Sequence, residues 1–234
     1  MLIATCYIML MALLDLVLSV VAPHDCLVCG LEGRLVCGWC APDAFPDLPS
    51  RCYRCKQITS DFAVCESCCR ITSLRHVWIR TDYDTTAKEL MRIYKYERVS
   101  SAHKTITEAM DEILPYLPVD TIIIPIPTAT SRVRQRGYDQ AELLARSLAR
   151  QRSLLWVRAV TRLTQSRQVG ADRHQRLSQL KNAFMVTKPL VIKNANILLV
   201  DDVVTTGATI EAMAATLKQA GAKSITAIAF AQKH

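Results

Sequence analysis

The sequence predicts an α/β protein with a central, mainly parallel sheet flanked by helices and preceded by a small cysteine-rich module. Two observations support this prediction. In the second half of the chain, continuous apolar runs such as 196–201 and 225–230 alternate with segments of helical periodicity. Such runs are typical of parallel strands covered on both faces. Before residue 70 this pattern is replaced by four Cys-x-x-Cys pairs.

The composition excludes an intrinsically disordered chain. Of the 234 residues, 50% are hydrophobic, which is enough to bury a substantial core. The formal net charge is +8. This charge favours anionic partners, which include phosphate-bearing metabolites, nucleic acid and membrane surfaces, without choosing among them.

Residues 1–22 are strongly apolar, but they do not resemble a signal peptide. They lack a positively charged start, contain Asp15, and lead directly into cysteines that would oxidise outside the cell. We therefore expect an apolar helix that is buried or binds a partner. Membrane association is not expected, and a reducing cytoplasm is the expected location.

Residues 23–70 form the cysteine module, in which glycines and prolines interrupt any regular pattern. A Cys-x-x-Cys turn brings two thiolates to one zinc ion, and two such turns complete a tetrahedral site. The spacing does not exclude an interleaved arrangement, in which each site takes its two turns from non-adjacent pairs. Sequential pairing gives one site from Cys26, Cys29, Cys37 and Cys40, and a second from Cys52, Cys55, Cys65 and Cys68.

Both zinc ions are expected to be structural. With four protein thiolates around each ion, no coordination position remains for catalysis, and metal binding instead supplies folding free energy. Cys69 could compete with Cys68, but the two-residue spacing favours Cys68.

Residues 71–234 are predicted to form a single α/β domain. Its first half contains a strand, two helices, a strand ended by prolines, a basic loop, and a helix that Asp139 can cap. Its second half contains four strands and a last helix that ends at Gly221. The expected strands are 77–83, 121–127, 154–160, 183–186, 196–201 and 225–230; the expected helices are 85–99, 101–114, 139–151 and 208–220.

The segment NILLVDDVVTTGATIEAM joins an apolar strand, two adjacent carboxylates, a turn of small residues and a helix. The turn can offer backbone N–H groups, hydroxyls and a helix N-terminus to one phosphate. Glycine at its centre permits close approach of the backbone. The phosphate-binding candidates are Thr205, Thr206, Gly207, Ala208 and Thr209.

Asp201 and Asp202 lie at the carboxyl end of this strand, where ligands bind in open parallel sheets. There they can accept hydrogen bonds from the vicinal hydroxyls of a ribose. The alternative is an acidic pair that ends a strand, followed by a threonine that caps a helix. That alternative does not explain the whole arrangement.

The stretch from Ile197 to Thr209 resembles the phosphoribosyl pyrophosphate signature of type I phosphoribosyltransferases. The resemblance implies that Asp201 and Asp202 hold the ribose 2′- and 3′-hydroxyls. It also implies that residues 205–209 bind the 5′-phosphate.

A wider resemblance, to the ComF family of competence-associated proteins, covers nearly the whole chain. It rests on the paired cysteines, on PIPTATSRVRQRGYDQ and on RLSQLKNAF. It implies a type I phosphoribosyltransferase fold with an N-terminal zinc-ribbon module. Asp139 and Gln179 stand where the family pattern has Asn, so substrate contacts at these two positions are expected to differ.

The resemblance also implies where pyrophosphate binds. The loop after strand 121–127 would hold it through Ile126, Pro127 and Thr128, with Arg134 and Arg136 nearby, because arginine pairs well with phosphate oxygens. The alternative is that this basic loop is a solvated surface segment that binds no pyrophosphate.

The polar stretch 162–181 corresponds to the hood that closes over such sites, and Arg173 and Arg176 are its catalytic candidates beside Asp201 and Asp202. The alternative is an exposed loop. Mg²⁺ is expected to bind together with phosphoribosyl pyrophosphate.

Two functions stay open at this point. The first is a phosphoribosyltransferase-like protein that binds phosphoribosyl pyrophosphate and acts in natural transformation, the uptake of DNA. No residue identifies its acceptor. The second is a non-catalytic protein of the uptake machinery that retains the pocket and binds single-stranded DNA, or serves as an adaptor. A DNA-uptake helicase or another competence protein is the expected protein partner.

Overall fold

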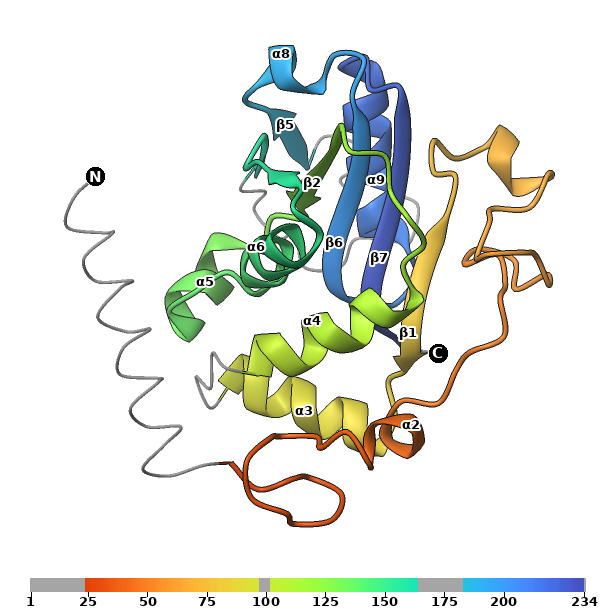
Figure 1. Ribbon diagram of the computed structural model, residues 1–234. Coiled ribbons are helices and arrows are strands. Elements are labelled where there is room, and N and C mark those ends of the chain that lie inside the picture. Colours follow the sequence, from red (N-terminus) through yellow and green to blue (C-terminus); the bar gives the residue numbers. More distant parts are fainter. Residues whose placement is uncertain (1–23, 97–101, 164–182, 234) are drawn as a thin grey trace, which may run out of the picture.

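The computed structural model describes residues 24–96, 102–163 and 183–233 (Figure 1). The predicted helix over residues 1–22 lies outside these ranges. So do Arg173 and Arg176, together with nearly all of the predicted hood.

Within the described ranges, the main sheet has five strands in the order β1-β7-β6-β2-β3. Each neighbouring pair is parallel, which confirms the predicted α/β class. The strands are β1 (Val77–Asp82), β2 (Thr121–Pro125), β3 (Leu155–Trp156), β6 (Asn196–Val204) and β7 (Ser224–Gln232).

Helices cover both faces of this sheet (Figure 1). Leu198 and Val200 of β6 pack into the apolar core that includes α3, α4 and α6, whereas Ile197 and Leu199 pack into the core that includes α9. Because successive strand side chains point to opposite faces, a strand covered on both faces must be apolar throughout. The helices are α3 (Thr85–Tyr96), α4 (Ala102–Ile113), α6 (Gln140–Arg152) and α9 (Ala208–Gln219).

The segment predicted to be a basic loop contains a helix instead, α5 (Thr130–Arg136). Neither glycine nor proline interrupts it, and Gly137 ends it with a left-handed φ of 87°. Glycine adopts that conformation without steric cost, so it is a favourable helix terminator.

The predicted strand over 154–160 divides into two parts. Its start is β3, and its end continues into β4 (Val160–Arg162), which pairs antiparallel with β5 (Phe184–Val186) in a separate two-stranded sheet. The predicted strand 183–186 therefore exists but lies outside the main sheet. A short helix, α8 (Pro189–Ile192), leads from β5 to β6.

The cysteine segment packs against the sheet domain on the side of β1 and α4. The ring of Phe45, directly after α2 (Ala41–Ala44), meets Phe230 of β7 edge-on at 5.2 Å. The buried guanidinium of Arg80 in β1 lies 3.2 Å from Asp47 and 3.2 Å from Glu112 of α4. A single 3₁₀ turn, η1 (Cys68–Arg70), closes the segment.

None of the helices in the described ranges is long and apolar enough to cross a membrane.

Candidate functional site

The predicted ligand-binding segments meet at the carboxyl ends of two neighbouring parallel strands, β2 and β6. The backbone N–H of Ile126 donates to the carbonyl of Val200 at 3.0 Å. The segment that starts at Ile126 therefore leaves β2 directly beside Asp201 of β6. Such an edge is where ligands bind in open parallel sheets.

Asp201 is partly buried, and its Oδ1 accepts a hydrogen bond from the backbone N–H of Asp202 at 2.9 Å. Burial, followed by the negative charge of Asp202, raises the pKa of Asp201 to about 8, although the nearby Lys95 opposes the shift. At neutral pH the acidic pair therefore carries less than two full charges.

Lys95, in the last turn of α3, is the counter-ion of this pair. Its Nζ lies 2.8 Å from Oδ2 of Asp202, and both side chains are only 16% exposed. Sequence reasoning missed Lys95 because it lies more than 100 residues from the acidic pair, and one lysine at the end of an amphipathic helix carries no signal of its own.

The loop between β6 and α9 keeps its threonines accessible. Thr205 and Thr206 are exposed, and the Thr206 hydroxyl accepts from the backbone N–H of Ala208 at 3.4 Å. Gly207, with a φ of 76°, stands directly before the first turn of α9. Hydroxyls, backbone N–H groups and the positive end of a helix dipole thus gather in a single turn that can hold a phosphate.

A tyrosine from the cysteine segment packs directly against this loop. A Cβ at Gly207 would lie 2.9 Å from Cε2 of Tyr53, and the Tyr53 hydroxyl donates to Glu211 of α9 at 2.8 Å. Arg54 forms an ion pair with the same carboxylate at 2.5 Å. Because burial raises the pKa of Tyr53 far above its ordinary value, the hydroxyl stays protonated. This contact was not predicted.

The segment after β2 is held by Asp139, which stands at the start of α6. The Thr128 hydroxyl donates to Asp139 Oδ1 at 3.0 Å, and the backbone N–H of Thr128 approaches Oδ2 at 3.3 Å. Asp139 also caps α6 by accepting from the N–H of Glu142. Burial raises the pKa of Asp139. The residue that departs from the ComF pattern therefore positions the predicted pyrophosphate loop.

The two predicted arginines of this region lie in different surroundings. Arg134 is exposed, whereas Arg136 is buried and donates to Gln140 at 2.9 Å. The Arg136 guanidinium also lies over the ring of Tyr96, 5.5 Å from its centroid. Of the two, Arg134 is the one with a guanidinium open to solvent.

Eight cysteines form two clusters in which the four sulfur atoms lie within 4.8 Å of one another. The grouping follows the sequential pairing: Cys26, Cys29, Cys37 and Cys40 in one cluster, and Cys52, Cys55, Cys65 and Cys68 in the other. Both clusters fit a tetrahedral four-thiolate zinc site. Cys69 stays outside, and its thiol donates to the carbonyl of Glu66.

Each cluster contains at least one thiol with a lowered pKa. Burial raises the pKa of Cys26, but backbone N–H groups of Cys29 and Cys37 outweigh it and lower the value to about 6. The Ser67 hydroxyl and the backbone N–H of Cys68 lower the pKa of Cys65 to about 6 as well. Thiolates are the form that binds metal.

Comparison with protein families matches residues 133–234 to a phosphoribosyl transferase domain. Together with the parallel sheet and the cysteine clusters, it shows a phosphoribosyltransferase fold preceded by an N-terminal cysteine module.

Curated proteins resemble the chain over much of its length. The DNA utilization protein YhgH of Salmonella typhi is 28% identical over 214 residues, 86% of each chain. The competence protein ComFC of Bacillus subtilis is 28% identical over 181 residues, which cover 73% of this chain and 72% of that protein. Competence protein F of Haemophilus influenzae is 33% identical over 115 residues, 47% of this chain and 49% of the relative.

Among solved structures, one match is the glutamine phosphoribosylpyrophosphate amidotransferase of B. subtilis in complex with ADP and GMP. The match covers 56% of this chain and 26% of the amidotransferase chain. Its sequence identity is 16% and the TM-score is 0.40.

Proposed function

Because the chain belongs to the ComF family of competence-associated proteins, we propose that it binds phosphoribosyl pyrophosphate at the carboxyl ends of β2 and β6 and acts in the uptake of DNA. The phosphoribosyltransferase fold and the competence proteins among its relatives support this proposal. One observation supports it most strongly. The acidic pair, the threonine loop and the segment after β2 lie together at one edge of the sheet.

In this proposal each segment binds one part of the ligand. Asp201 and Asp202 accept hydrogen bonds from the ribose hydroxyls, and residues 205–209 hold the 5′-phosphate. Residues 126–128 hold the pyrophosphate, and the exposed Arg134 adds positive charge. Arg136, which is buried, supports the loop through Gln140. Arg173 and Arg176 remain proposed hood residues.

Mg²⁺ fits the oxygen donors around this edge, which are carboxylates and a threonine hydroxyl. When bound, it neutralises charge on the pyrophosphate and draws electrons from the leaving group. The acidic pair orients the ribose and stabilises the positive charge that develops on its ring in a transfer reaction. Each cysteine cluster holds one structural zinc ion in this proposal.

Calorimetric titration with phosphoribosyl pyrophosphate and Mg²⁺ tests the proposal. The wild type should bind with a Kd below about 1 mM, and Asp201→Ala/Asp202→Ala should weaken binding by at least about 100-fold, since both carboxyl groups that hydrogen-bond the ribose are lost. Asp84→Asn, at an exposed carboxylate directly before α3, is the control and should bind normally. Failure of the wild type to bind would refute the proposal.

A second function, binding of single-stranded DNA without catalysis, is favoured by Trp39. This side chain lies between two ligands of the first cysteine cluster and is 91% exposed. An exposed indole can stack on a base, and the net charge of +8 attracts the phosphate backbone. Electrophoretic shifts over a salt series should then show affinity that falls steeply with salt and drops about tenfold in Trp39→Ala. Negligible affinity at low salt would eliminate this function.

We further propose that the protein works in the cytoplasm, where its cysteines stay reduced and can bind zinc. A DNA-uptake helicase or another competence protein is the proposed partner there.

A further inference from the structure

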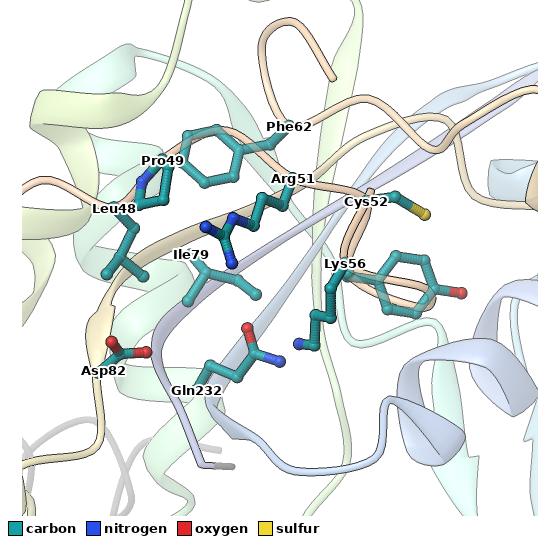
Figure 2. Close-up of a pocket in the computed structure, with 10 residues that line it drawn as sticks. Leu48, Pro49, Arg51, Cys52, Lys56, Phe62, Ile79, Asp82 and Gln232 are labelled. Atoms are coloured by element: carbon teal, nitrogen blue, oxygen red, sulfur yellow. The ribbon is translucent and has the colours of Figure 1, made fainter. Parts of the chain in front are cut away.

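A cavity of about 390 Å³ lies between the second cysteine segment and the carboxyl ends of β1 and β7 (Figure 2). Arg51, Tyr53 and Lys56 line it from the cysteine segment. Asp82 of β1 and Gln232 of β7 line it from the sheet. Its volume falls within the range of small-molecule sites. None of the proposed contacts to phosphoribosyl pyrophosphate accounts for this cavity.

Gln232 is the central polar group of the cavity. The residue is only 8% exposed, and its backbone carbonyl is fixed by the N–H of Tyr83 at 2.7 Å. The carboxamide points into the cavity (Figure 2) and has no hydrogen-bond partner among the residues that the structure describes. An amide with no protein partner is available to a ligand that offers a donor and an acceptor side by side.

Two cations face the same space. The ends of Arg51 and Lys56 point toward Gln232 in Figure 2, and neither forms an ion pair within 4 Å in the described ranges. These two side chains can therefore pair with an anionic group of a ligand.

The remaining walls are apolar. Phe62 and Ile79 line the cavity together with the ring of Tyr53. Such walls favour a flat ring over an extended polar chain, because they make contacts with its faces and remove apolar surface from water.

We propose that this cavity binds a small anion that carries a flat polar ring. Arg51 and Lys56 hold its carboxylate or phosphate group, and the Gln232 carboxamide pairs with a donor–acceptor edge of the ring. The site uses none of the residues assigned to phosphoribosyl pyrophosphate, so it can be tested separately.

The cavity nevertheless adjoins the phosphate loop. Gln232 pairs in register with Val204, the residue before Thr205, and Tyr53 contacts Gly207 as well as the cavity. A ligand in the cavity therefore contacts the side chain that packs against the loop.

The test is titration of the full-length protein with three probes, by calorimetry or ligand-detected NMR. Orotate and nicotinate present a ring carboxylate, and adenosine monophosphate presents a phosphate, so the probes distinguish the two kinds of anion. We expect at least one to bind with a Kd below about 1 mM. Arg51→Gln and Gln232→Met should each weaken binding at least about tenfold. Arg70→Gln, at an arginine whose side chain is 76% exposed, is the matched control and should bind normally.

Absence of binding by all three probes would overturn the inference, as would equal binding by wild type and both variants. Lys56→Gln, at an exposed side chain, serves as an independent variant if Gln232→Met fails to fold. The same variants are titrated with phosphoribosyl pyrophosphate, which they should bind like the wild type. A probe displaced competitively by phosphoribosyl pyrophosphate would occupy the other site and would also overturn the inference.

Discussion

At position 207 two separate constraints require glycine. The φ of 76° lies in the left-handed region, which costs other L-residues about 1 kcal/mol or more. The ring of Tyr53 also occupies the space that a Cβ would enter, with Cε2 at 2.9 Å. Relieving one constraint would leave the other in place.

Gly207→Ala should therefore lower the free energy of unfolding by about 1–3 kcal/mol and weaken binding of phosphoribosyl pyrophosphate at least about tenfold. Gly38→Ala is the matched control, because a Cβ there meets nothing within 4 Å and φ is not in the left-handed region. Thermal unfolding and calorimetry measure the two effects. Equal stability of the two variants would contradict the prediction.

Asp201 should make stability depend on pH. Its folded-state pKa of about 8 lies above the ordinary value of 3.8. The stability it contributes is therefore complete below about pH 4 and is lost as the pH rises through 8. Asp201→Asn removes this dependence.

Between pH 6 and pH 9, the unfolding free energy of the wild type should fall by about 2–3 kcal/mol relative to that of Asp201→Asn. Urea unfolding at several pH values measures this difference. Asp84→Asn, at an exposed carboxylate, should track the wild type. A difference that does not change with pH would contradict the assignment.

The roles of residues could be predicted where the functional residues follow one another in the sequence. Asp201, Asp202 and the threonine loop follow one another along a strand, a turn and a helix, so their grouping needed no tertiary information. Lys95 and Tyr53 reach the same site from distant segments. A local sequence pattern does not show which distant side chain will contact the site. These two contacts could therefore be found only in the structure.

At the scale of elements, α3 and β6 are joined at the site by a largely buried ion pair. Lys95 closes the last turn of α3, and Asp202 lies near the end of β6. Removal of the lysine would leave a carboxylate partly buried without its partner, which is far more costly than the loss of an exposed pair.

Lys95→Met should thus destabilise the fold by about 1–3 kcal/mol, whereas Lys88→Met, on the exposed face of the same helix, should change stability by less than about 0.5 kcal/mol. Denaturant unfolding of both variants gives the comparison. If the two substitutions have equal effects, the buried ion pair contributes nothing.

The elements of the main sheet were predictable because parallel strands covered on both faces must be apolar throughout. β6 and β7 are apolar over most of their length, as this rule requires. The helix between them was predictable from the glycines at its ends, since it starts after Gly207 and stops before Gly221. The errors arose where the pattern is ambiguous. Basic side chains made α5 resemble a loop, and the apolar run around Trp156 gave no sign that the strand would change sheets.

Across the whole molecule, the second cysteine cluster is tied to the phosphate loop. Tyr53 and Arg54 lie between two cysteines of that cluster, and both bind Glu211 in the first turn of α9. If zinc folds this turn, then zinc also positions the ring of Tyr53 against Gly207.

Cys68→Ser should reduce the zinc content from about two ions per chain to about one and weaken binding of phosphoribosyl pyrophosphate several-fold. The adjacent Cys69→Ser should keep both ions and normal affinity, because Cys69 lies outside the cluster. Metal analysis and calorimetry on the same samples test both statements. Two ions in Cys68→Ser would show that this thiol is not a ligand.

The position of β7 between β1 and β6 has a consequence for the kinetics of folding. Val77 of β1 pairs with Ala227 of β7, about 150 residues away along the chain. Contacts between such distant residues require closure of a long loop and are associated with slow folding. In the described sheet β1 pairs with β7 alone, and we expect it to join the sheet after β6 and β7 have paired. Because the cysteine segment leads directly into β1, it too should reach its final place late.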